Sequence, residues 1–300
     1  MNPYHLPVLL HESVAQLIQS PDGTYVDVTF GGGGHSREIL AHLSAQGKLY
    51  SYDRDNDALQ NVPDDARFTL IHHNFSYLKH FLRYYNAIPV QGILADLGIS
   101  SHQIDEAERG FSHRFDGPLD MRMDRDAAKS ADTLINGSSE EELARIFYVY
   151  GEIANSRKLA SIICTRRAAK AIHTTGELKT AIESCIPKAS PSRYLSQVFQ
   201  ALRMEVNGEM KALEKMLIQA SEVLDTGAKL VVISYHSLED RMVKNFFNSG
   251  NFTGKKETDL YGNIQRPLKP MGSKPILPTD QEIAQNKRAR SAKMRIAIKN

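Results

Sequence analysis

The sequence is poor in cysteine, and it contains no long run of apolar residues. Cys164 and Cys185 are its only cysteines, and their spacing fits neither a zinc site nor a CxxC redox motif. This excludes a disulfide-stabilised scaffold, and both thiols are expected to be reduced. No segment approaches the roughly 18 consecutive apolar residues of a membrane span, and the first residues do not resemble a secretion signal. We therefore expect a cytoplasmic protein without a membrane anchor.

Net charge is also small, at +2, but it is unevenly distributed along the chain. Residues 251–300 contain eleven lysines and arginines against four acidic residues, whereas the first 250 residues carry a net charge of −5. A second basic stretch, residues 157–203, holds nine basic and two acidic residues. Such local charge favours contact with a polyanion, because phosphate neutralisation depends on nearby cations. A solvated surface without such a partner is the alternative.

What the sequence does contain is an alternation of short β-branched runs with segments of helical periodicity. Four turn-bounded runs predict strands at residues 24–30, 48–55, 66–75 and 90–98. Apolar residues at helical spacing predict helices at residues 9–19, 36–47 and 76–85. Strands that alternate with helices in this way predict a parallel, doubly wound α/β sheet.

The alternation stops near residue 104. From there to residue 206 the sequence predicts helices without a convincing strand, at residues 139–151, 155–172 and 175–186. Strand character returns at 228–237 and weakly at 293–299, after a predicted helix at 207–224, and the basic, proline-containing residues 272–291 are expected to be extended. We therefore expect a discontinuous sheet domain, residues 1–103 and 207–300, with an inserted helical domain, residues 104–206.

Four consecutive glycines, Gly31 to Gly34, join the first predicted strand to the following helix. Because glycine permits positive φ and leaves the backbone bare, such a turn is where a doubly wound sheet binds a nucleotide-like ligand. Asp53, about 20 residues later at the end of the second strand, is placed to accept hydrogen bonds from two ribose hydroxyls. A loose loop and a solvated strand end are the alternatives for these two features.

The glycine turn alone does not distinguish between adenosine cofactors. Gly31, Gly33 and Ser36 nearly fit the dinucleotide fingerprint, with serine in place of the third glycine. Asp27 and Asp96, near the ends of the first and fourth strands, would repel a pyrophosphate. S-adenosylmethionine carries a sulfonium and an ammonium and no phosphate, so these acidic residues favour it over NAD, which stays the alternative.

The segment after the fourth strand carries groups that could act on a substrate. Asp96 and Ser100 are expected at the carboxyl edge of the sheet, where such folds place reacting groups. An exocyclic base amine has a delocalised lone pair, and an acceptor oxygen aimed at its N–H would hold the nitrogen in line with the methyl group. The alternatives are cofactor contact for Asp96 and helix capping for Ser100.

A second polar segment follows the predicted strand at residues 228–237. His236 could orient a substrate there, and a histidine hydrogen-bonded within the protein is the alternative. Ser237 and Asp240 have the spacing of a helix N-cap and are expected to form one. Phe75, after the third strand, could lie against an adenine ring, or it could be an ordinary core residue.

These residues belong to a set of motifs that span nearly the whole chain. In order, the motifs are HLPVLLHE, DVTFGGGGHS, YDRD, LADLGISS, ERGFS, DGPLDMRMD, FQALRMEVNGE, ISYHSLEDR and NKRARSAKMRIA. Together they resemble the family of the bacterial ribosomal RNA small subunit methyltransferase H, also called MraW. Members of that family methylate N4 of a cytidine in 16S rRNA near the decoding centre.

The resemblance implies a Rossmann-like class I S-adenosylmethionine-dependent methyltransferase sheet with an inserted helical domain. By the same resemblance, the cofactor contacts are Gly33, Gly34, His35, Asp53, Phe75, Asp96 and Gln103. The implied partner is 16S rRNA within the small ribosomal subunit, with no membrane partner, and both monomer and homodimer stay open. The family pattern names no catalytic base, so Asp96, Ser100 and His236 are candidates.

The polar loop at residues 106–124 alternates arginines with aspartates around two phenylalanines. Such a loop can fold over a site, with arginines on phosphates and an aromatic ring against a splayed base. Our hypothesis is a lid that accepts a flipped cytosine, with Arg109, Phe111 and Arg114 in contact with RNA. An interdomain salt-bridge network is the alternative.

Three other functions compete with RNA methylation. An NAD-dependent oxidoreductase would use the near-fingerprint and Asp53. A catalytically silent RNA-binding assembly factor would keep the fold, but such a protein has no need of the glycine turn, Asp53 and Asp96 together. A small-molecule methyltransferase would have no use for the basic tail and the insertion.

Overall fold

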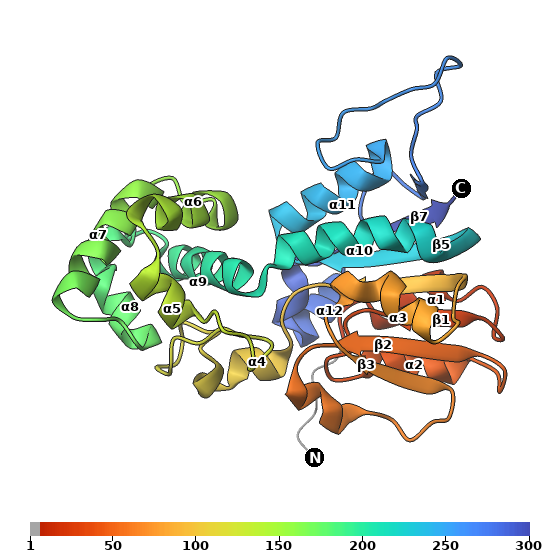
Figure 1. The fold of residues 1–300 in the computed structure, drawn as a ribbon, viewed down its shortest axis with the longest axis horizontal. Helices are drawn as coiled ribbons and strands as arrows, with labels where there is room; N and C mark the ends of the chain where they lie inside the picture. Colours follow the sequence, from red (N-terminus) through yellow and green to blue (C-terminus); the bar gives the residue numbers. More distant parts are fainter. Residues whose placement is uncertain (1–6) are drawn as a thin grey trace. The chain divides into compact units, whose positions relative to one another are not determined.

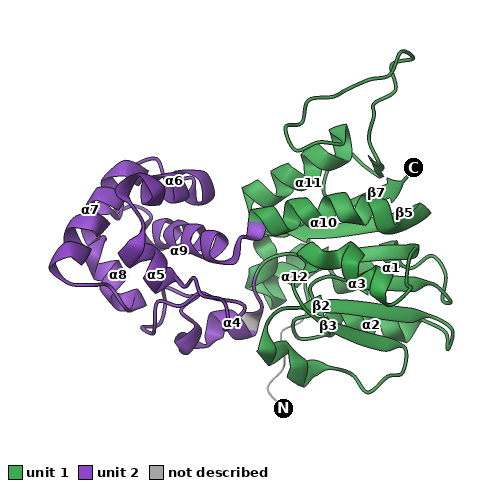
Figure 2. Ribbon diagram, viewed as in Figure 1, with its two compact units in different colours: residues 1–98, 210–300 green, residues 99–209 purple. Residues whose placement is uncertain are grey.

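In the computed structural model, which describes residues 7–300, the chain forms two compact units (Figure 2). Unit 1 consists of the chain up to Gly98 together with Met210–Asn300, and unit 2 consists of Ile99–Glu209. Unit 2 therefore begins directly after the fourth strand of the sheet. The predicted borders of the insertion, at residues 104 and 206, lie a few residues inside unit 2.

Unit 1 is built on a seven-stranded sheet with the order β3-β2-β1-β4-β5-β7-β6 (Figure 1). The strands are β1 (Thr24–Asp27), β2 (Lys48–Asp53), β3 (Phe68–His72), β4 (Val90–Asp96), β5 (Leu224–Ser234), β6 (Leu268–Pro270) and β7 (Lys293–Lys299). Strands β1 to β5 are parallel, which confirms the predicted α/β sheet. Strands β7 and β6 pair antiparallel at one edge, so the sheet is mixed rather than purely parallel.

Helices cover both faces of this sheet. Val26 and Val232 point into one core, which they share with α3 (Leu78–Tyr84), α10 (Glu209–Val223) and α11 (Ser237–Ser249). Tyr25 and Val231 are one residue out of phase and pack on the other face, against α1 (Leu10–Leu17) and α2 (Gly34–His42). Side chains alternate along a strand, so both faces are buried and the carboxyl ends of β1 to β5 meet at one edge.

The basic segment at residues 272–291 is not extended throughout, and this prediction is wrong. It contains α12 (Asp280–Gln285) and the 3₁₀ helix η5 (Lys287–Ser291). The hydroxyl of Thr279 caps α12 by accepting a hydrogen bond from the Glu282 N–H. Glu282 in turn accepts from the Leu9 N–H at 2.7 Å, which ties this segment to the start of α1.

Unit 2 is made of helices and loops, as the predicted helical insertion requires. Its elements are α4 (Ser101–Asp105), η3 (Ala107–Arg109), α5 (Ala131–Gly137), α6 (Glu140–Gly151), α7 (Ser156–Ala169), α8 (Thr175–Ala181), η4 (Glu183–Cys185) and α9 (Pro191–Asn207). Phe147 of α6, Ile163 of α7 and Leu202 of α9 are fully buried in its core. Within residues 7–300, no helix is long and apolar enough to cross a membrane.

Candidate active site

The glycine turn between β1 and α2 is shaped first by the packing of the protein itself. Gly33 has a φ of +74°, and a Cβ there would lie 3.0 Å from the Phe30 ring. A Cβ on Gly34 would overlap the ring of Pro7. Gly31, with a φ of +51°, is different, because a Cβ there would meet nothing within 4 Å. Of these three glycines, Gly31 is the one with open space over its backbone, as the prediction of a ligand on the turn requires.

Asp27 does not line a cofactor pocket, contrary to the sequence-based expectation. It is fully buried, and its carboxylate accepts hydrogen bonds from the Ser36 hydroxyl at 2.7 Å and the Thr29 N–H at 3.0 Å. The Ser36 hydroxyl also lies 2.9 Å from that of Ser51 on β2. Asp27 therefore joins the end of β1 to the first turn of α2 and holds the glycine turn in place.

Asp53 ends β2 beside this turn. Its Oδ2 accepts from the Gly31 N–H at 2.7 Å, and its Oδ1 accepts from the Asp55 N–H at 2.8 Å. Burial raises the pKa of the Asp53 carboxyl, while these two hydrogen bonds act in the opposite direction. The Arg54 N–H also donates to this carboxylate, and because a carboxylate has about four acceptor positions, one remains for a ribose hydroxyl. The geometry fits the predicted ribose contact.

His35 is predicted to contact the cofactor, but its imidazole ring is buried. Its Nε2 donates to the Val8 carbonyl at 3.2 Å, and its Nδ1 lies 3.7 Å from Asp96 Oδ2. What remains for a ligand is the backbone of the first turn of α2, where helix N–H groups and the helix dipole favour an anion. Phe75 is half-buried at the start of η2 (Phe75–Tyr77) and packs partly on the core.

Asp96 ends β4 and contacts a tyrosine from the end of β5. The Tyr235 hydroxyl donates to Asp96 Oδ1 at 2.7 Å. Burial raises the pKa of Asp96 to about 6, while His35 and the Tyr235 hydrogen bond act against this rise. At neutral pH the carboxylate is therefore mostly ionised, and one-fifth of its side chain is exposed (21%).

Sequence reasoning missed Tyr235 as a site residue. Its hydroxyl and the Asp96 carboxylate are brought together by two parallel neighbours, β4 and β5, from positions 139 residues apart. No local spacing reports such a contact. The one available signal was the position of Tyr235 near the end of the strand predicted at residues 228–237, at the edge where Asp96 was also expected.

His236 is the N-cap of α11, and the predicted cap by Ser237 and Asp240 is wrong. The His236 ring accepts from the Glu239 N–H, at 3.4 Å from its Nδ1. Asp240 instead accepts from the Arg295 guanidinium at 2.6 and 3.2 Å, which links α11 to β7. The structure thus gives His236 a local role in the helix, and its predicted role toward a substrate stays a prediction.

Ser100 and Gln103 form a reciprocal capping box at the start of α4, in unit 2. The Ser100 hydroxyl accepts from the Gln103 N–H at 3.2 Å, and the Gln103 side-chain oxygen accepts from the Ser100 N–H at 3.1 Å. Capping was the alternative weighed for Ser100, and the structure contains it. The catalytic role of Ser100 and the cofactor contact of Gln103 stay predictions.

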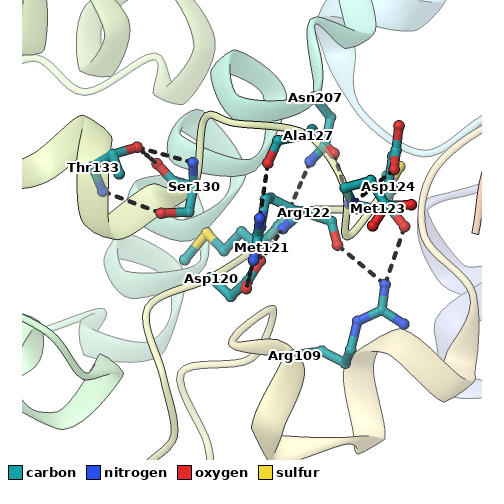
Figure 3. Close-up of polar contacts among 11 residues, drawn as sticks. Arg109, Asp120, Met121, Arg122, Met123, Asp124, Ala127, Ser130, Thr133 and Asn207 are labelled. Carbon is teal, nitrogen blue, oxygen red and sulfur yellow. Dashed lines mark hydrogen bonds and ion pairs between the residues drawn. The ribbon is translucent and has the colours of Figure 1, made fainter.

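Two of the three residues predicted to contact RNA from the lid are buried in unit 2. Arg109 is 2% exposed, and its guanidinium donates to the carbonyls of Arg122 and Met123 at 3.1 and 3.3 Å (Figure 3). Phe111, 7% exposed, belongs to the core of the unit. Arg122 pairs with Asp120 through two hydrogen bonds of 2.8 and 3.0 Å. This part of the loop stabilises unit 2. Arg109 and Phe111 are buried there, which does not fit their predicted contact with RNA.

Comparisons with known proteins agree over nearly the whole length. The MraW methylase family matches residues 2–300. A ribosomal RNA small subunit methyltransferase H from Parabacteroides distasonis is 54% identical over 297 residues, which is 99% of this chain and 97% of that protein. A protein of the same name from Cytophaga hutchinsonii is also 54% identical, over 98% of this chain and 99% of its own.

Likeness to solved structures is weaker. An rRNA methylase from Streptococcus thermophilus matches with a TM-score of 0.43 and 13% identity, over 96% of this chain and 93% of that one. The sequence matches, at 54% identity over nearly the whole chain, therefore establish the family. The chain belongs to the MraW methylase family, and it is an S-adenosylmethionine-dependent methyltransferase.

Proposed function

We propose that this chain transfers a methyl group to the exocyclic N4 of a cytidine in 16S rRNA, near the decoding centre of the small ribosomal subunit. Relatives 54% identical to it are named for methylation of small-subunit ribosomal RNA, which supports the substrate class. The motif resemblance supports the N4 atom and the location. A cytoplasmic location is part of the same proposal.

The residues at the carboxyl edge of the sheet fit the methyl donor. Asp53 would hold a ribose hydroxyl, and the first turn of α2, with Gly33, Gly34 and His35, would hold the carboxylate of the methionine part. Phe75 would lie against the adenine, and Asp96 and Gln103 complete the proposed set. When bound, the donor's sulfonium supplies a methyl group that is open to nucleophilic attack.

The observation that carries the N4 proposal is the partly exposed Asp96 carboxylate at the end of β4. A cytosine N4 amine is a weak nucleophile because its lone pair is delocalised into the ring. The Asp96 carboxylate, held at Oδ1 by the Tyr235 hydroxyl, has acceptor positions left for an amine N–H. Such a hydrogen bond orients the nitrogen and favours its pyramidal form as the new bond develops. Ser100 and His236 are secondary candidates for contact with the base.

The test is nucleoside mass spectrometry of rRNA from small subunits that lack base methylation, after incubation with this protein and S-adenosylmethionine. We expect N4-methylcytidine with the wild-type protein and its loss by at least about a hundredfold with Asp96→Ala, as for removal of a group aimed at the reacting atom. A different methylated nucleoside would contradict the N4 assignment. No methylated nucleoside, from whole subunits and from naked RNA, would contradict the RNA substrate itself.

A titration separates the remaining rival functions. We expect S-adenosylhomocysteine to bind, and NADH to bind weakly or not at all, because Asp96 would face its pyrophosphate. Binding of S-adenosylhomocysteine without any RNA methylation would favour a small-molecule methyltransferase.

A further inference from the structure

An exposed aromatic side chain in unit 2 belongs to a loop that contacts two helices carrying cations. Phe115 is 45% exposed, although it belongs to a loop whose neighbouring Phe111 is buried. Arg114 precedes it in the chain, and the loop contacts α8, which carries Lys179, and α9, which carries Arg193. We call these four residues the Phe115 surface.

The backbone that carries Phe115 is fixed. The Thr175 hydroxyl donates to the Phe115 carbonyl at 2.8 Å and accepts from the Gly117 N–H at 3.2 Å. Asp116 accepts from the Gly176 N–H at 2.8 Å, and a Cβ on Gly176 would collide with that carboxylate. The loop is therefore held against the start of α8, and binding through the Phe115 ring costs little backbone entropy.

His113 shows that the cations lie close together. Burial, followed by the charges of Lys179 and Arg114, lowers the pKa of the His113 imidazole, so both cations lie within electrostatic range of it. Its Nε2 lies 3.3 Å from the hydroxyl of Ser196 on α9. Arg193 precedes Ser196 by three residues, so the two share one face of that helix.

Acidic side chains do not neutralise this surface. In the part of the chain that the structure describes, Arg114, Lys179 and Arg193 take part in none of the ion pairs found. Asp116, next to Phe115, accepts from the Gly176 N–H and keeps its negative charge, which the three cations outnumber. Glu177 is paired with Lys170 at 2.7 Å. Positive charge around the ring is thus left for an outside anion.

We propose that the Phe115 surface binds an unpaired segment of the rRNA substrate, with a base stacked on the Phe115 ring and flanking phosphates on Arg114, Lys179 and Arg193. The inference rests on the proposed function, because it names a surface with which the same enzyme binds its RNA substrate. An aromatic ring among cations matches a base and its phosphates, and phenylalanine has no polar group with which to select one base. The surface therefore supplies affinity and position rather than sequence choice.

The first experiment measures RNA binding by Phe115→Ala. An unpaired RNA oligonucleotide should bind about five- to a hundredfold more weakly than to the wild type, as for loss of one stacked base. The duplex of the same length should change much less, because its bases are not free to stack. The matched control is Tyr148→Ala, which removes an aromatic side chain, 66% exposed, from α6 of the same unit. Tyr148→Ala should bind both RNAs as the wild type does.

The second experiment removes one charge. Arg114→Gln should reduce the slope of log affinity against log salt by about 0.7, the value for one phosphate contact on a single strand. Arg83→Gln, an exposed cation on α3 of unit 1, is the control and should leave the slope unchanged. Both variants alter exposed side chains, and thermal melting should match the wild type.

The outcomes separate this proposal from the proposed function. If the wild type methylates 16S rRNA and Phe115→Ala binds unpaired RNA as tightly as the wild type, the surface proposal is overturned and the function stands. If Phe115→Ala loses affinity for assembled subunits only, a ribosomal protein occupies the surface, and the RNA proposal is again overturned. With saturating RNA, we expect Phe115→Ala to keep its kcat and raise KM, because the surface binds and does not react.

Discussion

At the scale of single residues, the hydrogen bond from Tyr235 to Asp96 should determine the acid side of the pH profile. The hydroxyl stabilises the ionised carboxylate, whose pKa burial has raised to about 6. Tyr235→Phe removes that donor, so the pKa of Asp96 rises further. Since methyl transfer is proposed to need ionised Asp96, the acid limb of the kcat profile should move to higher pH by about one unit. Initial methylation rates across the acidic range measure this shift.

Tyr52→Phe is the matched control for this experiment. Tyr52 donates its hydroxyl hydrogen bond to the Leu78 carbonyl, inside the core of unit 1. Its loss should lower thermal stability and leave the acid limb where it is. If Tyr235→Phe and the wild type have superimposable pH profiles, Asp96 does not act as the ionised acceptor.

Asp53 makes a separate prediction about the cofactor. Asp53→Asn keeps the shape of the side chain but removes its charge and replaces one acceptor oxygen with a donor. Affinity for S-adenosylhomocysteine should fall roughly 10- to 100-fold, as for loss of a charged hydrogen bond. Isothermal titration measures it, and Asp64→Asn, at an exposed position after η1 (Asn56–Asn61), should bind normally. Equal affinities for all three proteins would remove Asp53 from the cofactor site.

The residue scale is also where sequence reasoning falls short. Asp53 and Asp96 are predicted site residues because each lies near the end of a predicted strand. Asp27 also lies near the end of a predicted strand, but it is buried, and its carboxylate accepts a hydrogen bond from the Ser36 hydroxyl. The position of Asp27 in the sequence does not indicate this contact. For Arg109, alternating charges suggested a surface loop. Its contacts with the carbonyls of residues 122 and 123 depend on a backbone path that charge alone does not reveal.

At the scale of elements, the turn before α2 depends on glycine for a reason that can be measured. Gly34→Ala places a Cβ against the Pro7 ring, so either the turn or the segment before α1 must move. We expect a loss of about 1–3 kcal/mol in the free energy of unfolding, as for overpacking elsewhere. Thermal or denaturant unfolding measures it.

Gly137→Ala is the control for that substitution. Gly137 ends α5, and a Cβ there would meet nothing within 4 Å. Alanine also reduces the freedom of the unfolded chain, so this variant should match or slightly exceed the wild type in stability. If the Gly34→Ala protein is as stable as Gly137→Ala, the turn accommodates the added Cβ beside Pro7 without loss of stability, contrary to this prediction.

Elements with strong periodicity were predictable, and short ones were not. The strands β1 to β5 and the helices α6, α7 and α10 lie within their predicted segments or within a few residues of them. Strand β6, Leu268–Pro270, has only three residues, one of them a proline. It is too short to show an alternation of apolar and polar residues. Helix α12 has six residues and follows Pro275 and Pro278, which made the segment look extended. Strand β6 depends on pairing with β7, and α12, besides its local Thr279 cap, is tied to the distant Leu9.

At the scale of the whole molecule, the uneven charge should make RNA binding steeply dependent on salt. Both basic stretches contain exposed cations that form no ion pair within residues 7–300, including Arg157, Lys158 and Arg166 in unit 2 and Lys255, Lys256 and Lys274 in unit 1. We expect each set to contact phosphates, since the relatives named for rRNA methylation imply a large polyanion.

Two triple variants, each with one set changed to glutamine, test this expectation. At about 0.7 per phosphate contact, each variant should lower the slope of log affinity against log salt by roughly two. Affinity for S-adenosylhomocysteine, measured in the same buffers, should stay equal to that of the wild type, because its proposed site lies on other residues. A set whose removal leaves the slope unchanged is a solvated surface, and in that case the other unit supplies the RNA contacts.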